Sequence, residues 1–505
     1  MTPASRAGGD DGVAALVPAP AAVPVTVRRA RRSVTAAYAA QGFGFAVMLT
    51  NVPTYERYLG IGPDVITLVI LGVCVCAATG SALSGWVAAR SGSARVVTGG
   101  LVVAAAGVLV VGLSAGAGLL GTFFVGFAVY GLALGAVDAS TSMQGIDVQR
   151  AYGRSLIAAF FAANAAGGVV GSLAVSGAAA LGTTLPVSLA LVAGVVVVAV
   201  IVLRAGLASR TAAVVVAVSV GGSGIPAAGR TPVVPDGVAP AAGEDGGPEV
   251  VAAGTRRAGA RRPVAQGGHR APRAPGASGT VGAGTVLVLG AAMLAFPVAD
   301  SAVSSWGATF LQGVLGASAV VGPLGFGAYQ AMLICSRLLG DGAVERWGRV
   351  RVVALGGSVG VVGLGLVALS PAWPLAVLGF AATGLGLGVV APMAFSAAGD
   401  RAAEAVAEAV AGPGVVARAG VVAGARADGT GAALATVEDA TDRAVARLNV
   451  FTYVGAVLGG ALTGVFATTD ALRLGFGVLA VLGLATVLLA GRFREAEVDV
   501  GAVDG

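Results

Sequence analysis

The sequence predicts an all-α polytopic membrane protein of about twelve transmembrane helices, arranged in two pseudo-symmetric six-helix halves. Hydrophobic residues make up 56% of the 505-residue chain and charged residues only 11%. A soluble domain carries about 25% charged residues, so lipid must be the solvent for most of this chain. Long apolar segments recur along the sequence, and a charged loop string appears at the same place in each half.

The membrane segments follow from length, because about 20 mostly apolar residues cross the hydrocarbon core. The first half contains six such segments, at residues 34–55, 64–88, 96–115, 119–143, 155–180 and 184–204. The second half contains six more, at residues 282–312, 318–342, 350–370, 373–398, 446–467 and 471–491. The 82 glycines fit such a bundle, since small residues let helices approach closely in lipid.

Polar stretches divide the chain. A stretch rich in Pro, Gly, Ala and Arg separates the halves and has too little apolar surface to pack. A second insertion lies between the tenth and eleventh spans, and its first residues suggest a short helix. We expect a disordered cytoplasmic N-terminus (1–33), an N-terminal half (34–205), a largely disordered cytoplasmic linker (206–280), a C-terminal half (281–492) with a cytoplasmic insertion (399–445), and a tail (493–505).

Arginine placement predicts the orientation, because short cytoplasmic loops carry an excess of basic residues. With the N-terminus inside, the outer loops hold only Arg57 and Arg473, and the remaining loop arginines are cytoplasmic. The sequence therefore predicts a multi-pass protein of the inner (plasma) membrane with both termini in the cytoplasm.

The repeated string R-x-G-x-x-R follows the second and the eighth span. The first copy is formed by Arg90, Gly92 and Arg95, with Gly85 before it. The second copy is formed by Arg346, Gly348 and Arg351, and the charged residues beside or within it are Asp341, Glu345 and Arg349. Glycine permits a sharp helix end, and flanking arginines can bond helix carbonyls. We expect the second copy to form a charge network that gates the bundle, and the first to be weaker because Ala89 replaces an acid.

At these strings the sequence resembles the major facilitator superfamily, whose loops between the second and third and between the eighth and ninth helices carry this pattern. A narrower likeness is to the fucose-permease-like branch and its uncharacterised bacterial members. It covers Asp138 to Gln144 with Tyr152-Gly153-Arg154, and Trp306 with the following loop. The sequence departs from that branch at Asn51, Phe161, Asp300 and Ser305. The resemblance implies a transporter that works by alternating access.

Two acids within predicted spans are the candidates for proton or substrate binding, because charge is costly inside a bilayer. Asp138 either carries a proton or pairs with Arg150 or Arg154. Asp300 either carries a proton, or hydrogen-bonds a neighbouring helix, or lies near the outer interface. Neutral polar and aromatic residues could line the pocket or simply hold helices together. These are Gln41, Asn51, Gln144, Asn164, Trp306, Gln330 and Asn449.

We therefore expect a secondary active transporter of a small solute, coupled to protons and embedded in the lipid bilayer. The substrate is either a sugar-like polar solute for import or an amphipathic compound for export. The alternative is a transport-inactive sensor or scaffold that binds an unknown protein through its insertions. We expect no enzymatic activity, cofactor, metal or nucleic acid, and the phosphate-binding P-loop requires a lysine that this chain lacks.

Overall fold

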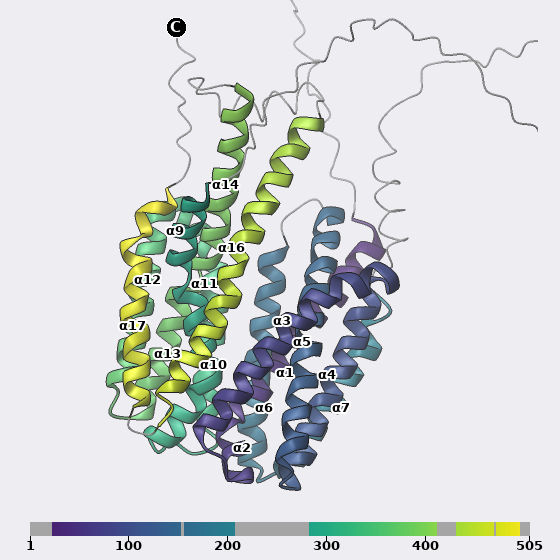
Figure 1. The fold of residues 1–505 in the computed structure, drawn as a ribbon, viewed down its shortest axis with the longest axis vertical. Helices are drawn as coiled ribbons and strands as arrows, with labels where there is room; N and C mark the ends of the chain where they lie inside the picture. Colours follow the sequence, from purple (N-terminus) through teal and green to yellow (C-terminus); the bar gives the residue numbers. More distant parts are fainter. Residues whose placement is uncertain (1–22, 153–155, 208–281, 412–430, 469–470, 495–505) are drawn as a thin grey trace, which may run out of the picture.

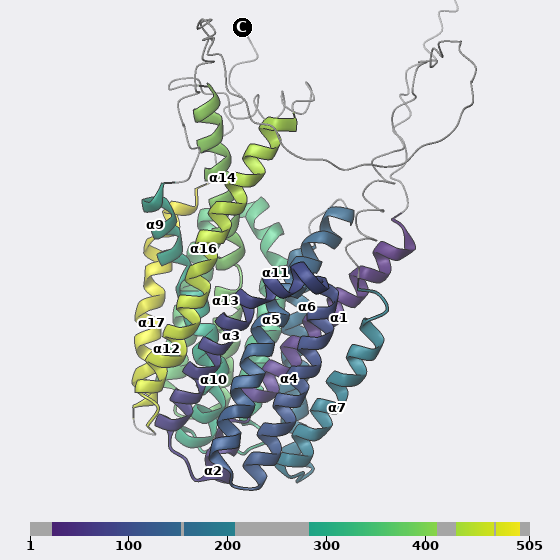
Figure 2. The same ribbon diagram turned by 45° about the vertical axis from the view of Figure 1, so that its right-hand side comes forward.

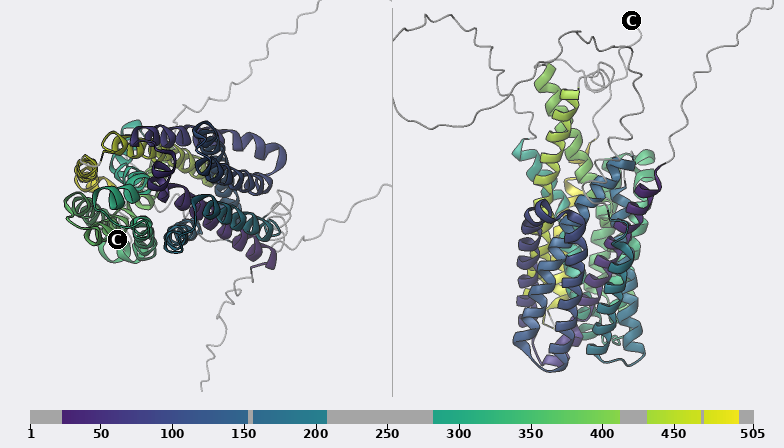
Figure 3. Two further views of the ribbon diagram at one scale, coloured as in Figure 1. Left: turned by 90° about the horizontal axis from the view of Figure 1, so that it is seen from below. Right: turned by 90° about the vertical axis from the view of Figure 1, so that its right-hand side faces the viewer.

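The computed structural model describes residues 23–152, 156–207, 282–411, 431–468 and 471–494. These residues form a bundle of long helices in two lobes, with the N-terminal half beside the C-terminal half (Figures 1 and 3). Within the described residues, eight segments are long and apolar enough to cross a membrane, and residues 450–465 and 472–488 form shorter apolar helices. The predicted all-α polytopic fold is confirmed.

The N-terminal half consists of six long helices and one short helix. They are α1 (Val25–Thr50), α2 (Val52–Leu59), α3 (Pro63–Ser91), α4 (Ser93–Gly116), α5 (Leu120–Tyr152), α6 (Ile157–Ala180) and α7 (Leu185–Leu203). α2 is too short to span and follows α1 after Asn51. We call the end of the bundle that carries α2 the α2 end, and the opposite end, where α7 finishes and α9 begins, the linker end (Figure 1).

The described part of the C-terminal half also forms six long helical segments, two of which are interrupted. Its helices are α9 (Ala283–Met293), α10 (Ala295–Thr309), α11 (Gly322–Trp347), α12 (Arg349–Leu369), α13 (Trp373–Leu387), α14 (Val390–Ala411), α16 (Gly431–Val465) and α17 (Leu472–Leu488). A break at Leu294 divides α9 from α10, near Pro297, which lacks an N–H to donate. Residues 310–314 extend α10 as a π-helical turn.

Close helix approach explains part of the glycine content. α1 and α6 cross where Gly167 lies against the backbone of Ala39 and Gly42 lies against that of Asn164. A Cβ atom at either glycine would collide with backbone atoms. Lipid gives no hydrophobic drive for helix association, so such close van der Waals contact is what holds a membrane bundle together.

Three boundaries differ from those expected. α1 begins at Val25 rather than 34, so the arginine run from Arg28 to Arg32 is helical, in keeping with the high helix propensity of arginine. The ends of the insertion at 399–445 continue α14 to Ala411 and start α16 at Gly431, and the two helices pack together beyond the rest of the bundle (Figure 2). The linker at 208–281 and the tail from 495 lie outside the described residues, as do 1–22.

Candidate functional site

A cavity of about 110 Å³ lies between the two halves. The N-terminal half supplies mostly apolar and aromatic side chains, and the C-terminal half supplies a polar wall from α10. The N-terminal lining includes Phe45, Met48, Val69, Cys74, Phe127 and Tyr130, and the C-terminal lining is Asp300, Ser301, Ser304, Ser305 and Ala456. This is the geometry of a small-molecule pocket, which is largely apolar with a few convergent polar groups.

Three residues of the polar wall, Asp300, Ser301 and Ser304, can act as hydrogen-bond acceptors. The Ser301 hydroxyl donates to the backbone oxygen of Ala456 at 2.6 Å, and the Ser304 hydroxyl donates to the backbone oxygen of Ser301 at 3.0 Å. Each hydroxyl has one proton to donate, so both present lone pairs to any further partner. An ionised Asp300 carboxylate also only accepts. The wall therefore offers acceptors to a molecule in the cavity.

Asp300 has no ion-pair partner within 4.0 Å among the described side chains. On α11, Tyr329 interacts with it through its hydroxyl and Arg337 acts on it electrostatically. Arg337 itself reaches the other half, where it donates to the backbone oxygen of Phe161 at 3.1 Å and lies 5.8 Å from the centre of the Phe161 ring. One arginine thus connects the acid at the cavity with α6.

Asp138 lies elsewhere, inside the N-terminal half. Its carboxylate accepts a hydrogen bond from Gln41 Nε2 at 2.9 Å, which joins α5 to α1. One turn away on each helix, the hydroxyls of Tyr38 and Ser142 are 3.2 Å apart. Asp138 therefore pairs with an amide rather than with Arg150, and Arg154 lies outside the described residues.

The other neutral polar candidates join helices or cap them. Asn51 bonds the Val47 oxygen at 2.8 Å, Gln144 bonds the Ser93 hydroxyl at 2.6 Å, and Asn164 bonds the Tyr38 oxygen at 3.2 Å. Trp306 is fully buried and donates to the Gly460 oxygen at 3.1 Å. Gln330 is buried against Gly168 of the other half. The side chain of Asn449 lies outside the described part of the chain.

Of these predicted residues, the cavity lining includes Asp300. Sequence reasoning missed Tyr55, Phe127 and Tyr130, which line the same cavity. Aromatic residues occur on all faces of these helices, so their spacing did not indicate which of them point inward. Only the rotation of each helix in the packed bundle decides this.

The two loop strings end helices as expected. Gly92 and Gly348 cap α3 and α11 with φ of 88° and 76°. Arg95 donates to the Ser91 oxygen at 3.1 Å, and the Arg90 guanidinium lies 3.6 Å from the centre of the Trp86 ring. Gly85 is exposed on α3.

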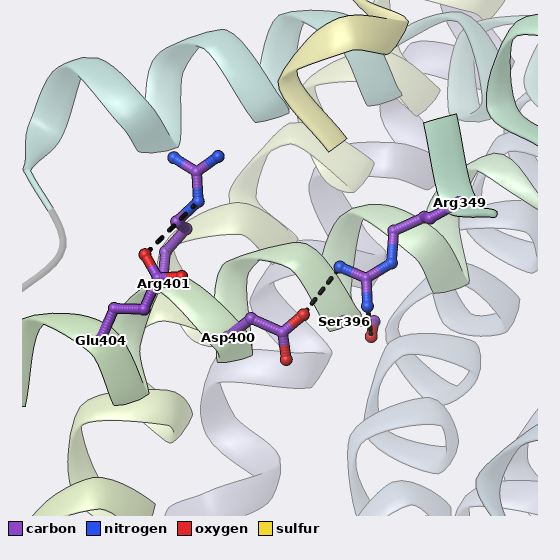
Figure 4. A network of polar contacts seen from close by, with 5 residues as sticks. All are labelled: Arg349, Ser396, Asp400, Arg401 and Glu404. Atoms are coloured by element: carbon purple, nitrogen blue, oxygen red, sulfur yellow. Dashed lines mark hydrogen bonds and ion pairs between the residues drawn. The ribbon is translucent and has the colours of Figure 1, made fainter. Parts of the chain in front are cut away.

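The second loop string contributes an ion pair that the sequence did not predict. Arg349 pairs with Asp400 of α14 at 2.7 Å and also donates to the Ser396 hydroxyl at 3.1 Å (Figure 4). Asp341, Glu345 and Arg346 are exposed at the end of α11. Arg349 starts α12 and faces inward, where α14 passes, so its acidic partner comes from another helix. The charge network expected among the loop residues stays a prediction.

Several contacts join the two halves near the α2 end. There Arg57 Nη1 donates to Gln312 Oε1 at 3.1 Å, and the Ser176 hydroxyl donates to the Val320 oxygen at 2.6 Å. Gly464 of α16 lies against Thr67 of α3. Farther toward the linker end, Arg337 of α11 joins the halves through its bond to the Phe161 oxygen of α6.

Comparisons with known proteins agree with this architecture. Residues 34–425 match the sequence profile of the Major Facilitator Superfamily. An uncharacterized MFS-type transporter of Yersinia pestis is 24% identical over 77% of this chain and 85% of its own length. An uncharacterized transporter of Sinorhizobium fredii is 27% identical over 42% of this chain, a match that spans only 46% of that protein.

Solved structures show the same fold. The nucleoside transporter NupG aligns with a TM-score of 0.55 at 11% identity, covering 94% of this chain and 100% of NupG. A bacterial homolog of the human lysosomal transporter Spinster, in an inward-facing and unoccupied conformation, aligns with a TM-score of 0.53 at 14% identity. That alignment covers 94% of this chain and 99% of the homolog.

Proposed function

Because this chain belongs to the Major Facilitator Superfamily, we propose that it is a secondary active transporter that moves a small solute by alternating access. The family and its transporter relatives support membrane transport. One observation carries the finer proposal: both halves contribute walls to a single cavity between them. A site at the junction of two six-helix halves can be opened to either side by rocking one half against the other.

The cavity favours an amphipathic substrate over a sugar. A sugar presents many hydroxyls and needs several donors and acceptors around it, whereas this cavity offers a mostly apolar lining and one wall of acceptors. A matching compound has an apolar or aromatic body and a hydrogen-bond-donating end, such as an ammonium group. Of the two substrate classes that the sequence left open, this supports export of an amphipathic compound.

The same carboxylate gives a route to proton coupling. A carboxylate in a low-dielectric cavity without a close ion-pair partner is costly, so Asp300 gains from either a proton or a cationic ligand. If the Asp300 carboxylate binds either a proton or a cationic ligand, but not both, then the ligand must leave when the proton binds. Proton binding and ligand release are thereby coupled. Asp138 is the second candidate proton site.

We further propose that the protein lies in the inner membrane and that its linker end faces the cytoplasm. The arginine bias of the loops supports this orientation. The contacts at the α2 end then lie on the outer side.

Cys74 provides a direct test, because it lines the cavity. In a variant with Cys76→Ser and Cys335→Ser, the rate at which a small maleimide modifies Cys74 reports occupancy of the cavity. We expect phenethylamine to protect Cys74 and phenethyl alcohol, which has the same body without the charge, to protect it far less. Asp300→Asn should abolish the difference. Equal protection by both compounds would refute the proposed ligand class.

Flux separates transport from binding. In proteoliposomes with an imposed pH gradient, we expect an amine that protects Cys74 to move against its own concentration gradient. Protons should move in the opposite direction. Binding without flux in sealed vesicles would favour the sensor or scaffold instead.

A further inference from the structure

A second, much smaller cavity lies inside the N-terminal half. Its volume is about 20 Å³, and it is enclosed by α1, α4, α5 and α7. Its lining is apolar except for Gln41 and Tyr130. A single water needs about 10–15 Å³ of such space together with two or more polar partners, so the cavity has room for one water molecule.

Both polar residues lack a protein partner for one atom. Gln41 Nε2 bonds Asp138, but Gln41 Oε1 is buried with no hydrogen-bond partner among the described residues. The Tyr130 side chain is 3% exposed, and its hydroxyl is likewise without a partner there. Leaving such buried groups unsatisfied destabilises the folded protein.

The backbone of α1 makes room between these atoms. Gly44 lies one turn from Gln41 on the same helix face, and a Cβ atom at Gly44 would be 3.7 Å from the Tyr130 hydroxyl. The space in front of that hydroxyl is therefore kept open by the absence of a side chain at Gly44.

We propose that one buried water molecule occupies this cavity, accepts a hydrogen bond from the Tyr130 hydroxyl and donates one to Gln41 Oε1. Tyr130 also lines the cavity between the halves. Tyr130, the water and Gln41 therefore form a hydrogen-bonded chain from that cavity to the carboxylate of Asp138, in which the water holds the Gln41 amide in the orientation that donates to Asp138.

Few other titratable groups face Asp138. Gln41 bonds it from α1, and Tyr38, also on α1, acts on it electrostatically while its hydroxyl contacts Ser142. Apolar residues of α4 and α7 form the remaining cavity wall, among them Leu101, Val108 and Val196. The chain through Tyr130 is therefore the polar connection toward the cavity between the halves.

The first test is a high-resolution structure of the full chain in lipid nanodiscs. We expect ordered density within hydrogen-bond distance of the Tyr130 hydroxyl and Gln41 Oε1 in the wild type. Gly44→Ala should remove it, because the methyl group enters the water's space while every polar atom remains. Gly72→Ala is the matched control, since a Cβ there meets nothing within 4 Å. A well-resolved cavity without density in the wild type overturns the water site.

The second test measures the hydrogen-bonded chain at Asp138 without any substrate. The infrared difference between the wild type and Asp138→Asn isolates the carboxyl band of Asp138, whose frequency depends on the hydrogen bond that it accepts from Gln41. We expect Tyr130→Phe and Gly44→Ala to shift this band, because each removes the water that orients the Gln41 amide. Tyr55→Phe is the control, because the Tyr55 hydroxyl contacts the Met48 sulfur instead. An Asp138 band at the wild-type frequency in both variants overturns the chain.

Both tests remain informative if transport fails. They use neither a substrate nor flux, so a water site can stand when the proposed transport is refuted, and the reverse also holds.

Discussion

Replacing Gly167 by alanine should separate α1 from α6 and destabilise the bundle. The new Cβ would collide with the Ala39 carbonyl oxygen and lie 2.8 Å from the carbonyl carbon and 2.9 Å from the Phe43 nitrogen. Ordinary contact begins near 3.4 Å, so the α1 backbone must retreat by at least about 0.6 Å. A gap of that size forfeits about a quarter or more of the dispersion energy along a contact.

We expect this change to lower the free energy of unfolding by about 2–3 kcal/mol, the upper part of the range for overpacked positions. The control is Gly177→Ala in the same helix, where a Cβ meets nothing within 4 Å. It should be neutral or slightly stabilising, because alanine is the better helix former. Reversible unfolding in mixed micelles measures both variants. Equal stability of the two would refute the close-packing explanation of the glycine content.

Two further predictions concern the ends of the bundle. Glu56 of α2 lies outside the spanning segments, and burial raises its pKa from 4.5 to about 7. Ionisation of Glu56 therefore destabilises the folded state, and the free energy of unfolding should fall as pH rises from about 4.5 through about 7. Glu56→Gln should remove this pH dependence. Thermal midpoints that depend on pH equally in both proteins would contradict the prediction. In a double-mutant cycle, the effects of Arg349→Ala and Asp400→Ala on the free energy of unfolding should differ from additivity by about 1–3 kcal/mol, as expected for a charge-assisted bond. Additive effects would mean that the 2.7 Å pair does not contribute to stability.

Sequence alone predicted the number and order of the long helices because lipid imposes a length and a polarity on each of them. It also predicted the caps at Gly92 and Gly348, which depend only on local backbone chemistry. The start of α1 was missed, since a run of arginines looks like a loop when only hydropathy is read, although it is a good helix former.

The site was harder to predict because it depends on helix rotation and on pairing across helices. Asp300 and Asp138 are both acids in predicted spans, yet one lines the cavity between the halves and the other bonds Gln41 within one half. Tyr130, which touches both cavities, carries no charge and repeats no motif. Likewise, the acid that pairs with Arg349 lies 51 residues away, in a helix that the loop string does not include.

The most direct measurement of the central claim is the distance between the halves at both ends of the bundle. Spin labels at Arg57 and Gln312 report the α2 end, and labels at the exposed Arg90 and Arg346 report the linker end. In nanodiscs, pulsed electron resonance should show that a change of pH or addition of phenethylamine shortens the linker-end distance while it lengthens the α2-end distance. Two distance distributions that never change, or that change in the same direction, would contradict alternating access.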